Sequence, residues 1–174
     1  MTGEFKHIYI LDPQAEFLAL ATPPDNEDGS PGQRDVGLLK KELPMIRELI
    51  LSTKKYIYVK VYRVEQDLSD FFYEIWALPA FPKLIVFDEV KTYGKTNPFI
   101  DYLYRLGGHK DMELIAIAHR FADLPLETRS QTDQYIIFQM TEPRDLKFLK
   151  DIVSEEVVEE VKRLRYFQYI KTEL

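Results

Sequence analysis

Two acidic side chains follow directly on an apolar run in the middle of the chain. Residues 84–87 (LIVF) are apolar, and Asp88 and Glu89 come next. A carboxylate at the end of a rigid strand can hold the water shell of a nucleotide-bound Mg²⁺, because magnesium prefers carboxylate oxygens and keeps several waters. A second carboxylate beside it can activate a water molecule for attack on a phosphate. The alternative is that both acids only begin the next turn.

Polar residues also follow two other apolar runs. Asp12 comes after residues 7–11, and His119 and Arg120 come after residues 113–118. The carboxyl ends of parallel strands meet at one edge of a sheet, and functional groups gather there. We therefore expect one edge to carry these side chains together with the acid pair: Asp12, Asp88, Glu89, His119 and Arg120.

The basic residues of this set have roles in phosphate chemistry. His119 could sense the γ-phosphate of a nucleotide, and Arg120 could stabilise phosphate charge. Arg129 precedes the apolar run 135–138 (YIIF) and could reach the phosphate of a neighbouring subunit. The alternative for each of the three is a solvated surface residue near the end of a strand.

The composition is that of an ordinary globular protein. The 174 residues are 45% hydrophobic and carry a net charge of −6, whereas a bare nucleic-acid module is usually basic. The absence of cysteine excludes disulfides, thiol catalysis and cysteine zinc sites, and it fits a reducing, cytoplasmic interior. No apolar run approaches 18 residues and the start has no leader pattern, so we expect no membrane contact.

Short apolar runs alternate with amphipathic runs, which is typical of an α/β fold with a mainly parallel sheet covered by helices on both faces. Strands are expected near residues 7–11, 56–62, 84–88, 113–118 and 134–139. Helices are expected over residues 36–53, 67–78, 98–106 and 143–150, and after Ser154. We expect a single domain over 1–174, a mobile loop over 22–35, and a C-terminal helix and strand within 151–174.

The order and spacing of these pieces resemble the FtsK/HerA group of P-loop ATPases, above all the viral and phage packaging ATPases and the zonula-occludens-toxin-like proteins. The resemblance is carried by HIYILDPQAEF at 7–17, LIVFDEV at 84–90, LGGH at 106–109, AHR at 118–120, DLP with RS at 123–130, and EPRDL at 142–146. It covers roughly residues 7–150. It implies that Asp88 is the Walker B acid that binds the metal and the nucleotide. Glu89, His119, Arg120 and Arg129 would then be the catalytic residues.

The sequence departs from this family at two places. The family's phosphate-binding loop, G-x-x-x-x-G-K-[ST], would lie upstream of the 7–11 strand, where only six residues stand. The GKT at residues 94–96 lacks the leading glycine and follows the Walker B strand instead of preceding it. The family's sensor Thr-Gln pair is Ala118 and His119 here, and the charge of a histidine depends on pH.

We therefore expect a P-loop-NTPase-like core without its phosphate-loop strand, leaving a re-ordered sheet or a gap filled by residues 166–170. The function expected is that of a degenerate or truncated ATPase-like domain of a virus or mobile element, with a scaffold or regulatory role in DNA handling. The isolated chain would bind no cofactor, and Mg-ATP would be the cofactor of an active form. A homo-oligomer or a partner ATPase subunit is expected, with DNA reached through the assembly.

Two alternatives stay open. The first is an active DNA-translocating or packaging ATPase whose phosphate loop is supplied by another segment or chain. The second is a non-catalytic protein-interaction domain on the same kind of sheet. Measured nucleotide binding distinguishes the first alternative from the other interpretations.

Overall fold

The computed structural model describes most of the chain, namely residues 7–14, 34–35, 56–62, 64–77, 82–91, 98–166 and 168–173. The helix predicted over 36–53 lies outside these ranges. So does the predicted loop over 22–35, except for Arg34–Asp35, which form the short strand β2. Within the described residues, no helix is long and apolar enough to span a bilayer.

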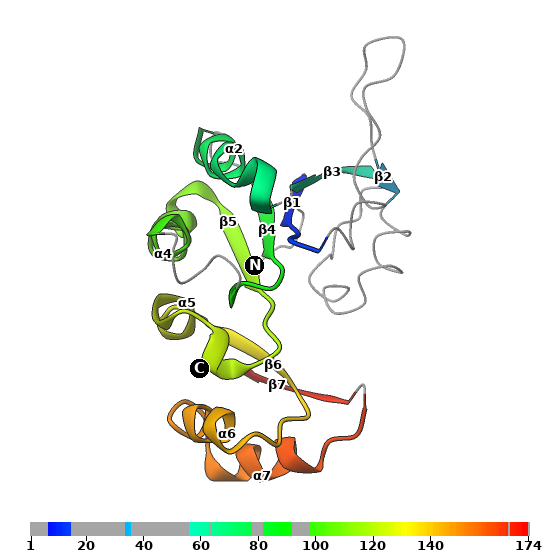
Figure 1. Ribbon diagram of the computed structural model, residues 1–174, viewed down its shortest axis with the longest axis vertical. Coiled ribbons are helices and arrows are strands. Elements are labelled where there is room, and N and C mark those ends of the chain that lie inside the picture. The colour runs from blue at the N-terminus through cyan, green and yellow to red at the C-terminus, as the bar shows by residue number, and fades with distance from the viewer. Residues whose placement is uncertain are drawn as a thin grey trace.

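A mainly parallel sheet forms the first half of the molecule (Figure 1), as the sequence predicts. Its parallel strands are β1 (His7–Leu11), β3 (Tyr56–Tyr62), β4 (Lys83–Phe87) and β5 (Met112–Ala116). The strand order is β2-β3-β1-β4-β5, and β2 runs antiparallel to β3. All five residues of β4 are buried, which explains why residues 84–87 are a continuous apolar run and not an alternating one. The buried Lys83 at its start donates from Nζ to the Lys110 carbonyl at 2.9 Å.

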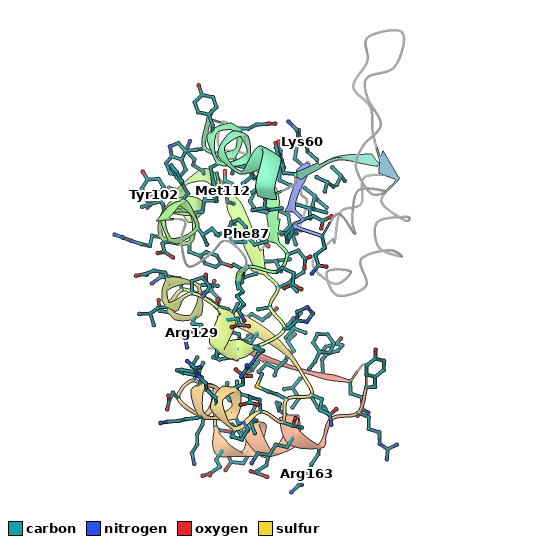
Figure 2. The ribbon with its side chains drawn as sticks, viewed as in Figure 1. Lys60, Phe87, Tyr102, Met112, Arg129 and Arg163 are labelled. Carbon is teal, nitrogen blue, oxygen red and sulfur yellow. The ribbon has the colours of Figure 1, made fainter. Side chains whose placement is uncertain are left out.

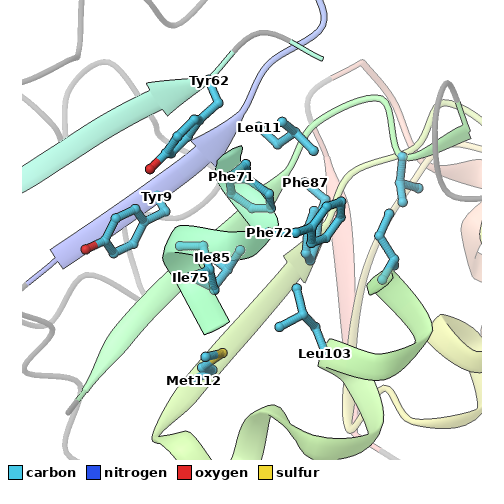
Figure 3. Packing of buried hydrophobic residues seen from close by; sticks show 12 residues of the cluster. Tyr9, Leu11, Tyr62, Phe71, Phe72, Ile75, Ile85, Phe87, Leu103 and Met112 are labelled. Atoms are coloured by element: carbon cyan, nitrogen blue, oxygen red, sulfur yellow. The ribbon is translucent and has the colours of Figure 1, made fainter. Parts of the chain in front are cut away.

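Helices α2 (Val64–Ala77) and α4 (Pro98–Leu106) pack on this sheet and share one hydrophobic core with it. Figure 3 shows the aromatic centre of this core, where the Phe71 ring meets Tyr62 at 5.0 Å and Phe87 at 6.0 Å between ring centroids. Both contacts are edge-to-face, the arrangement that aromatic quadrupoles favour. After α4, the 3₁₀ turn η3 (Gly107–Lys110) leads into β5. The core therefore fixes the strand ends that carry the acids.

The second half of the molecule is built on a separate two-stranded sheet. It follows β5 through η4 (Phe121–Asp123) and α5 (Leu126–Ser130), and it contains β6 (Gln134–Phe138), α6 (Pro143–Lys150), α7 (Glu155–Arg163) and β7 (Tyr169–Glu173). Its core contains Tyr135, Ile137, Leu149, Val158 and Val161. Ser154 caps α7 as predicted, because its Oγ accepts a hydrogen bond from the N–H of Val157.

The prediction that all five strands share one sheet is wrong for β6. β6 pairs antiparallel with β7 and is not part of the parallel sheet, which ends at β5. The suggestion that residues 166–170 fill a place in the parallel sheet is wrong for the same reason, since β7 covers an edge of β6 instead. A strand's polar backbone needs a partner strand, and for β6 the C-terminal strand provides it.

Candidate functional site

Two buried carboxylates stand at the ends of neighbouring strands. Asp12 follows β1 and is fully buried, and Asp88 follows β4 and is 7% exposed. The backbone holds both positions, because the Asp88 N–H donates to the Leu11 carbonyl at 3.0 Å and the Asp12 N–H donates to the Tyr62 carbonyl at 2.9 Å. The backbone hydrogen bonding between the strands thus extends one residue beyond β1 and β4, to Asp12 and Asp88. Such rigid positions suit a carboxylate that binds a hydrated cation.

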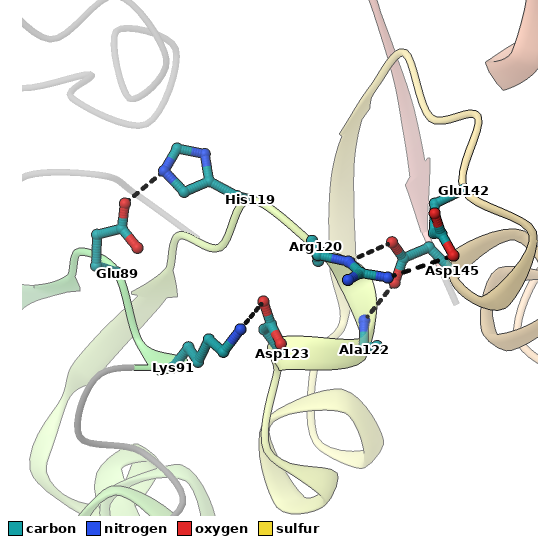
Figure 4. A network of polar contacts seen from close by, with 8 residues as sticks. All are labelled: Glu89, Lys91, His119, Arg120, Ala122, Asp123, Glu142 and Asp145. Carbon is teal, nitrogen blue, oxygen red and sulfur yellow. Dashed lines mark hydrogen bonds and ion pairs between the residues drawn. The ribbon is translucent and has the colours of Figure 1, made fainter.

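Glu89 is held by residues that follow two other strands, Gln14 after β1 and His119 after β5, and Figure 4 shows its contact with His119. Its Oε1 accepts a hydrogen bond from Gln14 Nε2 at 3.4 Å and is in ion-pair contact with His119 Nε2. The Glu89 backbone has a φ of 49°, in the left-handed region that non-glycine residues rarely adopt. Such a conformation costs about 1–3 kcal/mol and is common at functional sites. The carboxylate of Glu89 is therefore placed by its backbone and by two side chains.

Arg120 turns towards the second half of the molecule. Its Nε donates to Asp145 Oδ2 at 3.1 Å, and its Nη2 lies 3.6 Å from Glu142 Oε1. The N–H of Ala122 donates to the other oxygen of Asp145 at 2.9 Å. The hydrogen bond to Asp145 and its charge raise the pKa of Arg120. Nearby, Lys91 Nζ lies 3.2 Å from Asp123 Oδ2 and so links the residues after β4 to η4.

The predicted site residues divide into two groups. Asp12, Asp88, Glu89 and His119 follow the parallel strands, and Glu89 and His119 touch. Arg120 also follows β5, but it pairs with Asp145 and Glu142 of the second half and not with the acids of the strand ends. Arg129 belongs to the second half of the molecule (Figure 2), where its guanidinium stacks on the Phe148 ring of α6 at 4.9 Å. Its Nε is buried and has no hydrogen-bond partner among the described residues. The structure thus holds Arg129 within the chain, against α6.

Sequence analysis missed two residues that organise this region. Gln14 donates to Glu89, and its backbone N–H also donates to Asp12 Oδ1 at 3.1 Å. Asp145 is 2% exposed although it lies in the first turn of α6, where acids usually face water. Its place within EPRDL was the available signal, but an acid after a proline in a helix's first turn has an ordinary explanation in the helix dipole.

The donor chemistry of the strand ends fits magnesium better than a transition metal. Asp12, Asp88 and Glu89 offer carboxylate oxygens, and Mg²⁺ keeps several waters, so a single protein carboxylate is enough to hold it. In the part of the chain that the structure describes, no cluster of three or more His, Asp or Glu side chains could enclose a metal ion. A cation here would therefore be bound mainly together with a phosphate ligand.

Comparison with known proteins gives structural relatives. No family model matches the sequence, and no curated protein matches it. The DNA-packaging ATPase B204 from Sulfolobus turreted icosahedral virus has a similar structure, with a TM-score of 0.64 and 19% identity over 97% of this chain and 78% of that one. B204 from Sulfolobus turreted icosahedral virus 2, in complex with AMPPCP, gives a TM-score of 0.62 and 18% identity over 98% and 78%.

A third similar structure is the same virus 2 NTPase in complex with ATP-γS, with a TM-score of 0.60 and 16% identity over 99% of this chain and 94% of that one. Identities at this level establish the fold and nothing more. The chain therefore has the α/β fold of these genome-packaging NTPases, which is the P-loop-NTPase-like fold predicted from its sequence.

Proposed function

We propose that this chain is an ATPase-like domain of a viral or mobile-element DNA-packaging system, with a scaffold or regulatory role. The observation that carries the proposal is the arrangement of Asp88 and Glu89 at the end of β4, with His119, which follows the neighbouring strand β5, in contact with Glu89. This arrangement occurs in a fold shared with B204, a packaging NTPase whose structures include complexes with AMPPCP and ATP-γS.

The strand-end residues form the acidic half of a nucleotide site. Mg-ATP supplies the cation and the phosphoryl group when it is bound. Asp88, fixed by the Leu11 carbonyl through its backbone, would hold the water shell of the cation. Glu89 would take a proton from the attacking water, and its contacts with Gln14 and His119 orient the carboxylate for that step.

The phosphate-binding half is missing from the 174 residues. No G-x-x-x-x-G-K-[ST] occurs in them, and most nucleotide affinity in P-loop enzymes comes from that loop's backbone N–H groups and lysine. Asp88 and Glu89 are anions and repel a triphosphate. Arg120 offers compensating charge, but Asp145 and Glu142 already engage it. We therefore infer that the chain alone binds nucleotide weakly and does not hydrolyse it.

Calorimetry and phosphate release with Mg-ATP test this function. We expect a dissociation constant no smaller than about 0.1 mM, which corresponds to a binding free energy of about 5.5 kcal/mol. Phosphate release should be unchanged by Glu89→Gln, and equally unchanged by Glu127→Gln as a control on α5. Micromolar binding, or turnover that only Glu89→Gln abolishes, would instead establish an active packaging ATPase whose phosphate loop lies in a segment that sequence analysis did not identify.

Association is part of the same proposal. With a net charge of −6, the chain has no general attraction for DNA, so we place DNA contact in an assembly of several copies or with a partner ATPase subunit. A plain interaction domain is the remaining alternative. It predicts that substitutions at Asp88 and Glu89 leave DNA packaging by the assembly unchanged. The ATPase-like function predicts that the same substitutions abolish packaging.

A further inference from the structure

The outer face of the β6–β7 sheet carries two neighbouring aromatic rings. The inner face belongs to the C-terminal core, in which Tyr135 and Ile137 pack with residues of α6 and α7 (Figure 1). Successive side chains of a strand point to opposite faces, so Phe138 lies on the outer face. It stands opposite Tyr169 of β7, with 6.0 Å between the ring centroids. Phe138 is 42% exposed and Tyr169 is 46% exposed, so water reaches both residues.

The chain is basic around these rings, although it is acidic as a whole. Residues 161–172 (VKRLRYFQYIKT) contain four lysines and arginines and no acid, in a chain of net charge −6. Lys171 lies two residues beyond Tyr169 and therefore on the same face of the sheet. Arg165 comes just before β7, in a turn where the Gln168 N–H donates to the Arg165 carbonyl at 2.9 Å. Both basic side chains are exposed, and no described residue forms an ion pair with either.

The geometry of the two rings suits unpaired bases. The planes of Phe138 and Tyr169 are tilted by 58° to each other, so two bases stacked on them could not remain parallel. Bases in a duplex are parallel and already stacked on one another, whereas those of a single strand can separate and stack on aromatic side chains. Such stacking tolerates any sequence because every base has a flat π-face. Basic side chains beside the rings neutralise the phosphates that join the stacked bases.

We propose that the outer face of β6–β7 binds single-stranded DNA, with one base stacked on each of Phe138 and Tyr169 and with phosphates bound by Lys171 and Arg165. The exposed ring of Tyr166, next to Arg165 in the sequence, extends the same surface. The choice of DNA over RNA rests on the proposed function. The stacking surface itself rests only on elements of the C-terminal half, and it needs neither nucleotide nor the strand-end acids.

An anionic membrane is the competing ligand, because cationic and aromatic side chains also bind at lipid headgroups. Segments that bind in that way are typically amphipathic helices with a continuous apolar face. Here the rings stand on a pair of strands, and the outer face of β7 continues from Tyr169 to Lys171 and then to Glu173. Glu173, at the far end of the strand, accepts a hydrogen bond from Gln134 at 3.2 Å. This mixed polar face favours nucleic acid over lipid.

Fluorescence anisotropy of the full chain with a labelled oligothymidylate tests the surface. An oligomer of about 12 nucleotides covers one site of this kind. We expect a dissociation constant of about 1–100 µM at about 50 mM salt. Two neutralised phosphates give a salt slope of about −1.4, so an increase to about 200 mM salt should weaken binding about sevenfold. A duplex of the same length should bind at least about tenfold more weakly, because its bases cannot stack on the rings.

Matched variants separate stacking from charge. Tyr169→Leu removes the ring and keeps an apolar side chain, so binding should weaken about tenfold, whereas Tyr169→Phe should bind within about twofold of the unmodified chain. The control is Tyr73→Leu, which removes an exposed ring from α2 and should have no effect. Lys171→Gln should reduce the salt slope by about 0.7, while Lys147→Gln on α6 should leave the slope unchanged.

Several results would overturn the proposal. One is no binding of oligothymidylate with the chain at about 1 mM, and another is duplex binding as tight as that of the single strand. Tighter binding to phosphatidylserine vesicles that Tyr169→Leu abolishes would assign the face to a membrane. Oligouridylate bound at least about tenfold tighter would assign it to RNA. Circular dichroism checks that each variant folds, and if Tyr169→Leu does not, the salt slope of Lys171→Gln decides. No nucleotide is present in these measurements, so the proposed function keeps its own test.

Discussion

The two halves of the molecule place their charged groups in different ways. In the parallel sheet, Asp12 and Asp88 are buried at strand ends and fixed by backbone hydrogen bonds. In the C-terminal half, ion pairs such as Lys150–Glu155 lie on exposed helices, with side chains more than half accessible. Exposed pairs of this kind contribute little to stability, because water and salt screen them. The difference fits the proposed function, which needs the strand-end acids in fixed positions, while the helical charges mainly keep the surface solvated.

Among the described residues, two kinds of contact join the halves, one apolar and one polar. Leu124 and the packing of α4 against α5 provide an apolar joint. Asp145 provides a polar joint, because it binds both Arg120 and the Ala122 N–H from the segment that leaves β5. These two joints are the contacts through which ligand binding at the strand ends could change the C-terminal half. Their strength sets how closely the two halves are coupled.

The largest effects come from truncating the two cores. Phe71→Ala in the sheet core and Leu149→Ala in the C-terminal core should each lower the free energy of unfolding by about 3–5 kcal/mol, since both side chains are fully buried. We expect a single urea transition, because the joints link the halves. Fluorescence of Trp76, the chain's one tryptophan, reports on the first half, and circular dichroism reports on the whole chain.

The two probes can separate the halves if that expectation is wrong. If Leu149→Ala lowers the midpoint seen by circular dichroism but leaves the Trp76 midpoint unchanged, the C-terminal half unfolds independently. The two halves would then be independent folding units, and the apolar and polar joints would be too weak to couple their stabilities.

The polar joint should show the next largest effect. Asp145→Ala leaves the Ala122 N–H without its acceptor and removes the buried partner of Arg120, so we expect a loss of about 2 kcal/mol in urea unfolding. Glu142→Ala is the matched control, because Glu142 contacts the same guanidinium at 3.6 Å from an exposed position and should cost less than about 0.5 kcal/mol. An equal loss of unfolding free energy in the two variants would mean that the buried contacts of Asp145 stabilise the fold no more than an exposed ion pair does.

Much of the fold could be predicted because the apolar runs are short and sharply bounded. The strands over 7–11 and 56–62 and the helices over 98–106 and 143–150 have the predicted bounds, and β4 and β5 differ by a residue or two. The membership of β6 could not be predicted. A run such as YIIF forms a strand in either sheet, and its partner is settled by contacts that are distant in sequence.

The contacts of the candidate site were partly predictable for a similar reason. The rule that strand ends gather at one edge led to Glu89 and His119, which touch in the structure. Their contact with Gln14, the positive φ of Glu89 and the burial of Asp145 were not predictable, because each depends on how separate segments meet. The position of Arg129 before the apolar run 135–138 gave no indication that its guanidinium would stack on Phe148.

The smallest effect concerns the apolar joint, where α4 meets α5. Asp101 of α4 has a buried Oδ1 without a hydrogen-bond partner among the described residues. Burial raises the pKa of Asp101 above its ordinary value of 3.8, the negative charge of Glu127 on α5 raises it further, and Arg105 opposes the rise. A carboxyl whose folded-state pKa is raised favours the folded state less once it is ionised. Asp101 therefore lowers stability as pH increases from about 4 through its folded pKa.

Asp101→Asn removes this ionisation and keeps the shape of the side chain. At pH 7 the variant should be more stable than the unmodified chain by less than about 1 kcal/mol in urea unfolding. The gain should vanish below about pH 3, where Asp101 is protonated in both the folded and unfolded states. The control is Asp151→Asn at the exposed end of α6, which should leave stability unchanged at either pH. A gain from Asp101→Asn that persists at low pH would show that the ionisation of Asp101, disfavoured by burial and by Glu127, is not its cause.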